Sequence, residues 1–109
     1  MGKREAPVES YLKREVKKLG GETRKYKSQP GVADQLCFLP GGHLWLVEVK
    51  SDTGRESPMQ QRERELMTNL GFRSRVAYGM QAVTDIINEM REVINAGSTT
   101  KTLNFLSTP

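Results

Sequence analysis

Apolar and polar residues alternate along the chain in blocks, and the period of the alternation changes from block to block. Residues 44–50 read Leu-Trp-Leu-Val-Glu-Val-Lys, a short run rich in Val and aromatic residues. Such a run is typical of an interior β-strand. Because side chains alternate across a strand, Glu48 and Lys50 share one face, and Trp45, Val47 and Val49 share the other. We expect this strand to be the centre of the fold.

A second strand is predicted just upstream, over 33–39, and the turn sequence Pro40-Gly41-Gly42 follows it. Three-residue loops that contain Gly are common in hairpins. A loop of this length puts Asp34 opposite Glu48 on one face, with Cβ atoms about 4.5–5.5 Å apart. A two-residue loop would put the two carboxylates on opposite faces. The candidate chemistry therefore depends on the hairpin register.

Apolar residues at helical spacing predict helices over 7–19, 58–70 and 81–95. Ser57 and Gln60 have the spacing of a capping box at the start of the middle helix. The apolar stripe of that helix, which includes Met59 and Leu66, is expected to face the sheet. Gly97 is expected to end the last helix.

Alternation also predicts strands over 23–27 and 72–78. A strand, a helix and a further strand make a crossover, so the 72–78 strand should lie parallel to the 44–50 strand. With 109 residues, the chain is expected to form a single α/β domain of α-β-β-β-α-β-α order. Its mixed sheet would have about four strands flanked by helices, with the domain over 1–97 and a C-terminal tail over 98–109.

Composition narrows the function classes only slightly. The net charge of +4 is a weak bias toward anionic partners. The lone cysteine, Cys37, excludes a disulfide within the chain and suits a reducing compartment. The sequence has no signal peptide and no apolar run of the roughly 18 residues that a membrane span needs. We expect a cytoplasmic protein of a bacterium or a phage-infected cell, without a membrane partner.

The two opposed carboxylates carry the candidate chemistry. Asp34 and Glu48 would repel each other at neutral pH, and a bound cation between them removes that repulsion. Oxygen ligands favour Mg²⁺ or Mn²⁺. The alternative is a pair of solvated hairpin carboxylates with Lys50 as counter-charge. Cys37 and Trp45 are expected in the core, and His43 is expected as a solvated turn residue rather than a catalytic one.

Other candidate residues have ordinary structural explanations that stay open. Glu9 lies early in the first helix, where the helix dipole favours an acid. Gln60 is accounted for by its cap. Basic residues such as Lys25 and Lys27 suit contact with a phosphate backbone, or protection of an edge strand from aggregation.

Taken together, these motifs resemble the VRR-NUC family of the PD-(D/E)xK nuclease superfamily. The resemblance covers roughly residues 8–83 and departs at Ala33, where the family often has proline; the change removes a conformational preference but no ligand. Its motifs occur in the family's order: Glu9 in a first helix, Gly31-Val32-Ala33-Asp34, Val47-Glu48-Val49-Lys50, and Ser57-Pro58-Met59-Gln60 at a helix start.

The resemblance implies a restriction-endonuclease-like domain that hydrolyses phosphodiesters with Mg²⁺ or Mn²⁺. Asp34, Glu48 and the backbone carbonyl of Val49 would ligate the metal, and Glu9 would reach it directly or through water. Lys50 would orient or activate the attacking water. Gln60 would hold Lys50 or the scissile phosphate. Further contacts with nucleic acid are expected from Lys25, Lys27 and Arg55.

Small stand-alone members of the family resemble Holliday-junction resolvases and act as homodimers. The resemblance therefore implies a structure-selective DNA endonuclease that cuts branched DNA, such as four-way junctions, in repair or recombination. The last helix or residues 103–106 would form the dimer interface. Two alternatives stay open: a non-catalytic nucleic-acid-binding module, and the nuclease subunit of a larger restriction or repair complex.

Overall fold

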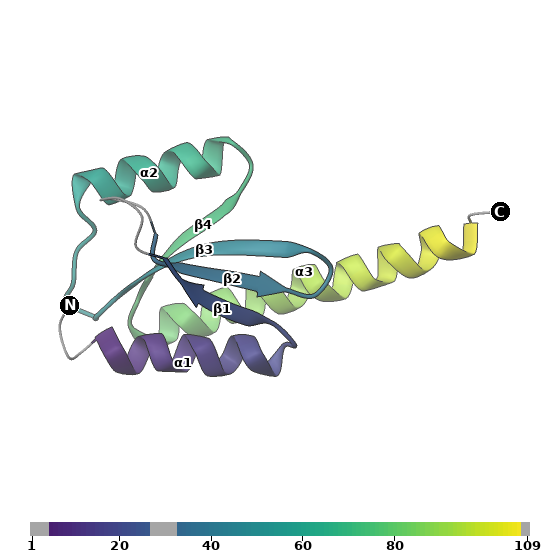
Figure 1. Cartoon of the computed structure of the whole chain (residues 1–109), viewed down its shortest axis with the longest axis horizontal. Helices are drawn as coiled ribbons and strands as arrows, with labels where there is room; N and C mark the ends of the chain where they lie inside the picture. The colour runs from purple at the N-terminus through teal and green to yellow at the C-terminus, as the bar shows by residue number, and fades with distance from the viewer. Residues whose placement is uncertain (1–4, 27–32, 108–109) are drawn as a thin grey trace.

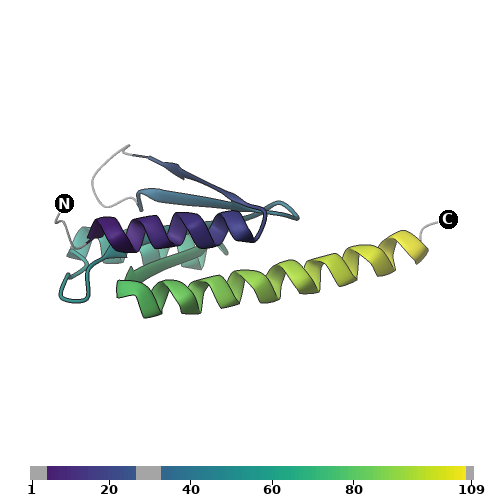
Figure 2. The same ribbon diagram turned by 90° about the horizontal axis from the view of Figure 1, so that it is seen from below.

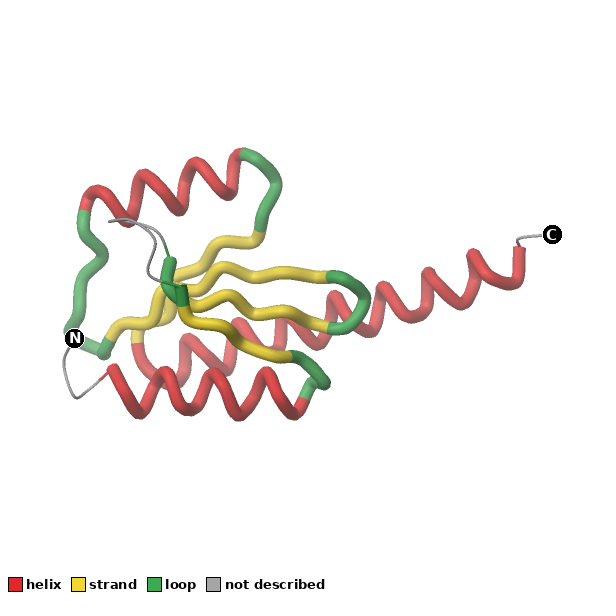
Figure 3. Tube along the Cα trace, in the orientation of Figure 1, coloured by secondary structure: helices red, strands yellow, loops and turns green. Residues whose placement is uncertain are grey.

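Three helices and four strands make up the fold. A computed structural model describes the backbone of residues 5–26 and 33–107, and the side chains of 5–26 and 33–97. The predicted α-β-β-β-α-β-α order is confirmed (Figures 1 and 3). In chain order the elements are α1 Glu5–Lys18, β1 Glu22–Lys25, β2 Gln35–Leu39, β3 His43–Lys50, α2 Pro58–Asn69, β4 Arg73–Tyr78 and α3 Gly79–Ser107.

The strands form one mixed sheet in the order β1-β2-β3-β4. β1, β2 and β3 pair antiparallel, whereas β3 and β4 pair parallel, as the crossover through α2 requires. The strand that carries Glu48 and Lys50 is therefore interior, with a neighbour on each side.

Helices α1 and α3 lie side by side against one face of the sheet, and α2 lies on the other side, over β4 (Figures 1 and 2). Trp45, Val47 and Val49 of β3 point to the α1–α3 face and are almost fully buried. They join a core completed by Val8, Leu12, Val16, Cys37, Leu39, Ala77, Val83, Ile86, Ile87 and Met90. Burial of Trp45 and Cys37 in this core is as predicted.

The hairpin register is the predicted one. Leu39 pairs with His43, and Leu36 pairs with Leu46. Gly41 and Gly42 close the turn with φ angles of +89° and +78°, values that L side chains adopt only with strain. His43 lies at this turn, away from the acidic residues.

The prediction for the apolar stripe of α2 is wrong. None of the residues of α2 is buried, and Met59, Leu66 and Leu70 are 47%, 50% and 62% exposed. The reason is the position of the helix: α2 packs on β4, at the edge of the sheet, and does not cross over the central strands. Helical spacing identifies an apolar face but does not say how much surface the sheet offers to it.

The prediction that Gly97 ends the last helix is also wrong, because α3 continues through it to Ser107. A Cβ at position 97 would lie 3.2 Å from His43 Nε2, so the glycine lets α3 pass close to the β2–β3 hairpin. An interior glycine costs a helix only about 1 kcal/mol relative to alanine, which the rest of the helix can outweigh. The division between a domain over 1–97 and a tail over 98–109 stays a prediction. In the part of the chain that the structure describes, no helix is both long enough and apolar enough to cross a membrane.

Candidate active site

Asp34 and Glu48 approach each other across the β2–β3 ladder. Gln35 at the start of β2 pairs with Val47 of β3. β2 begins at Gln35 rather than at residue 33, so Asp34 lies just before the strand; Glu48 follows Val47 in β3 and shares the face of Leu46. This is the face that α2 partly covers, and it is opposite to the main core. The register next to the two acids is thus the predicted one, and their common action on one face of the sheet stays a prediction.

The electrostatic effect of Asp34 on Glu48 indicates that the two carboxylates lie near each other. Burial raises the pKa of Asp34. Burial and, next, the negative charge of Asp34 raise the pKa of Glu48 to about 7, against a partial opposing effect of Lys50. The Oδ1 atom of Asp34 is buried and has no hydrogen-bond partner among the described residues. A buried carboxylate oxygen without a donor is costly unless a cation compensates it.

These observations fit a divalent cation held between Asp34 and Glu48. Each oxygen would gain a partner, and the repulsion that raises the pKa of Glu48 would be removed. The protein supplies a pair of carboxylates rather than a closed cage: among the described residues, no three acidic, histidine or cysteine side chains are grouped so as to hold a metal ion together. Water and substrate oxygens would complete the coordination of Mg²⁺, as is usual for this ion.

Glu9 does not point freely toward the pair. Its carboxylate lies 3.5 Å from Lys13 Nζ and 3.5 Å from Lys25 Nζ. Its charge contributes to the raised pKa of Asp34. A role for Glu9 at a metal ion therefore stays a prediction, and it would require the carboxylate to leave its two lysines.

Glu5 is an acid near the pair that the sequence analysis missed. It is the half-buried first residue of α1, and its negative charge contributes to the raised pKa values of both Asp34 and Glu48. A signal was present: Glu5 and Glu9 are four residues apart, so they lie on the same side of a helix. The predicted helix began at Pro7, which left Glu5 outside it.

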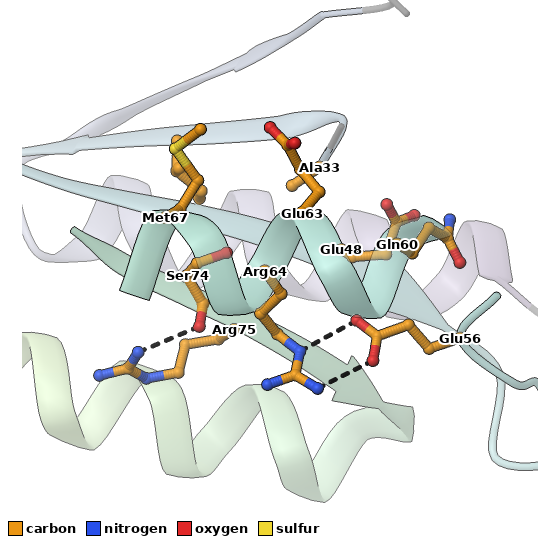
Figure 4. Close-up of a pocket in the computed structure, with 10 residues that line it drawn as sticks. Ala33, Glu48, Glu56, Gln60, Glu63, Arg64, Met67, Ser74 and Arg75 are labelled. Carbon is orange, nitrogen blue, oxygen red and sulfur yellow. Dashed lines mark hydrogen bonds and ion pairs between the residues drawn. The ribbon is translucent and has the colours of Figure 1, made fainter. Parts of the chain in front are cut away.

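Gln60 lies beside Glu48 and also caps α2. Ser57 N donates to Gln60 Oε1 at 2.8 Å, and Gln60 N donates to Ser57 Oγ at 3.1 Å, so the predicted capping box is confirmed. Glu48 and Gln60 line the same cavity of about 90 Å³ (Figure 4). The cap fixes the orientation of the Gln60 amide and leaves its Nε2 donor and the second lone pair of its oxygen for a ligand.

A bidentate ion pair in this cavity was not anticipated. Glu56, in the loop before α2, accepts hydrogen bonds from Arg64 Nε at 3.0 Å and from Arg64 Nη2 at 2.9 Å (Figure 4). The other lining residues are Ala33, Leu46, Glu63, Met67, Ser74 and Arg75. The eight-residue separation of Glu56 and Arg64 across a predicted loop gave no sequence signal for the pair.

Lys50 shares the Glu48 face of β3 and pairs in register with Tyr78 of β4. The Val49 side chain is buried in the core on the opposite face, and the metal contact predicted for its carbonyl remains untested.

Of the residues expected to contact nucleic acid, Lys25 lines a hollow of about 260 Å³ together with Lys13, Lys17, Glu22 and Thr23. Arg55 is exposed in the loop before α2. The third, Lys27, falls outside the residues that the structure describes.

Comparison with known proteins identifies the family of the chain. No family model matches the chain. "Putative nuclease p44" of Acyrthosiphon pisum secondary endosymbiont phage 1 is 39% identical over 70 residues, which are 62% of this chain and 75% of that protein. A solved structure described as "VRR_NUC domain" superposes with a TM-score of 0.72 at 32% identity and covers 80% of this chain and 97% of the other. With this sequence and structural similarity, the chain belongs to the VRR-NUC family of nucleases.

Proposed function

We propose that the chain is a metal-dependent DNA endonuclease whose active site is formed by Asp34, Glu48, Lys50 and Gln60. The observation that carries the proposal is the pair of half-buried carboxylates, in which Asp34 Oδ1 has no described partner and the pKa of Glu48 is raised by burial and by the charge of Asp34. Family membership supports nuclease chemistry on DNA.

The carboxylates of Asp34 and Glu48 would hold Mg²⁺ or Mn²⁺, with the carbonyl of Val49 as a further ligand. A bound ion of this kind lowers the pKa of water and neutralises charge on the phosphate. Lys50, on the same face as Glu48, would orient the attacking water. Gln60 would donate from Nε2 to a phosphate oxygen. Alternatively, its oxygen, which accepts one hydrogen bond from Ser57 N, would use its second lone pair to hold the Lys50 ammonium.

Lys25 and its neighbours would bind the DNA backbone. Lys25 lines a hollow with Lys13 and Lys17. The positive charge of Lys25 acts against the rise in the pKa of Asp34, which indicates that this hollow is near the active site. Non-specific contacts of this kind position a duplex without reading its sequence.

The substrate proposed here is branched DNA, and the active form is a homodimer. A four-way junction has two symmetric scissile strands, which a two-fold dimer matches. The expected interface on α3 includes residues 103–106, whose side chains are outside the described part of the chain. The dimer is tested by the mass of the isolated protein in solution.

The experiment that tests the function compares single-stranded, duplex, flap and four-way DNA side by side with Mg²⁺, with Mn²⁺ and with EDTA. The wild type should nick four-way DNA fastest and only with metal, and Glu48→Gln should be inactive. Equal nicking by both proteins would mean that another nuclease contaminates the preparation. DNA binding without nicking would favour a non-catalytic module, and activity only after adding a partner would favour a subunit of a larger machine.

A further inference from the structure

The ion pair between Glu56 and Arg64 is tied into the wall of the active-site cavity. The side chain of Glu56 is only 9% exposed, and that of Arg64 is 32% exposed. The backbone N–H of Glu56 also donates to Tyr78 Oη at 3.1 Å, which fixes the loop before α2 to β4. Glu56 is thus held at both its backbone and its carboxylate, directly before the cap of α2.

Both cations that line the cavity are bound to carboxylates other than Glu48. Arg64 is held by Glu56, and Arg75 is held by Glu89 at 3.1 Å from Nε and 2.6 Å from Nη2. Glu48 lines the same cavity and makes no hydrogen bond or ion pair with a described residue. A guanidinium and a half-buried carboxylate that share a cavity would normally pair.

We propose that Glu56 holds Arg64 away from Glu48 and so keeps the metal-binding carboxylate free. In this account Glu56 is a positioning residue, because it acts through Arg64 and does not touch metal or substrate. The inference rests on the proposed function of Glu48 as a metal ligand. Without Glu56, the guanidinium of Arg64 would be free to turn to Glu48, which lines the same cavity, and would compete with the metal.

This role differs from simple stabilisation of the fold in one measurable respect. If the pair only braced α2, removing either partner would have the same effect on the site. If Glu56 restrains Arg64, then Glu56→Gln weakens metal binding, but Arg64→Gln does not, since no guanidinium remains to compete. Each substitution removes the same bidentate pair, and Glu56→Gln also keeps the volume of the side chain.

The test measures Mn²⁺ binding in the absence of DNA. Calorimetry and the electron paramagnetic resonance signal of free Mn²⁺ both report the affinity. We expect Glu56→Gln to weaken binding on the order of tenfold, the range for losing a partner outside the ligand set. Arg64→Gln and the double variant should bind as tightly as the wild type or more tightly. Glu89→Gln is the control: it releases Arg75, which pairs in register with Val47 and reaches Glu89 of α3 on the face opposite to Glu48, so Mn²⁺ binding should be normal.

Wild-type affinity in Glu56→Gln, or equal weakening in Glu56→Gln and Arg64→Gln, would overturn the inference. If Glu56→Gln folds poorly, the double variant of Glu56→Gln and Arg64→Gln replaces it in the test. A folded double variant that binds Mn²⁺ weakly would also contradict the inference. Failure of the proposed function is a different result: the wild type itself would then bind no Mn²⁺ at the Asp34–Glu48 pair, and both proposals would fall.

Discussion

Ser57 and Gln60 hold each other through two hydrogen bonds, and the bond from Ser57 N to Gln60 Oε1, 2.8 Å long, decides how Gln60 can act. With its oxygen held by the cap, the amide is fixed in orientation, and its Nε2 donor is available in the cavity that it shares with Glu48. One residue thus joins the start of α2 to the active site.

Replacing Gln60 by glutamate should separate these two roles. Glutamate at this position still completes a capping box and suits the helix N-terminus, so the melting temperature should stay within a few degrees of the wild type. Loss of the donor and gain of a negative charge beside the phosphate should lower the cleavage rate by about 10²-fold or more. Single-turnover cleavage and thermal unfolding measure the two effects. A fast Gln60→Glu enzyme would show that the Nε2 donor is not used.

Stability without metal should fall as the pH rises toward neutrality. The pKa of Glu48 is about 7 in the folded chain, whereas the ordinary value is 4.5. Between these pH values the folded chain holds a proton that the unfolded chain has lost, so raising the pH destabilises the fold. Urea unfolding in EDTA at pH 5 and pH 8 measures this slope. Glu48→Gln should have a smaller slope, and an unchanged slope would mean that another group is responsible.

Gly79 should be unusually sensitive to alanine. It has a φ of +81° at the start of α3, and a Cβ there would collide with the carboxylate of Asp52. Gly42 has a similar φ of +78° but open space around its Cβ position, so Gly42→Ala is a matched control for backbone strain. Gly79→Ala should lose more stability than the control, by roughly 1–3 kcal/mol in urea unfolding. Equal losses would show that the loop at Asp52 moves aside freely.

Lys25→Ala should weaken DNA binding and reduce its salt dependence. A phosphate contact contributes about one unit to the slope of log affinity against log salt, so removing the contact should lower that slope by about 1. The Glu48→Gln background prevents cleavage during the titration. Lys18→Ala is the control, since Lys18 is 71% exposed and pairs with Glu15 on its own helix. Equal slopes for the two variants would place the DNA elsewhere.

The position of the acids was predictable because it depends on local rules. The Pro40-Gly41-Gly42 loop and the alternation of apolar residues set the register that pairs Gln35 with Val47, and Asp34 and Glu48 are the residues next to that pair. The capping residues of α2 were readable for the same reason, since their bonds span only three positions.

Features that depend on packing between distant elements were not predictable. The exposure of Leu66 follows from where α2 lies over β4, and the passage of α3 through Gly97 follows from its contact with the hairpin. The Glu56–Arg64 pair joins a loop to a helix turn, and Lys25 of β1 reaches Glu9 of α1. In each case, the periodicity of apolar residues predicts the helix or strand but not the element against which it packs.

The central claim is that Asp34 and Glu48 together hold one divalent cation. Its most direct test is the anomalous scattering of Mn²⁺ in crystals grown with the ion. We predict a peak between the two carboxylates, with an oxygen of each at about 2.0–2.3 Å. A structure with Mn²⁺ bound elsewhere, or with these two acids unliganded at saturating Mn²⁺, would contradict the account.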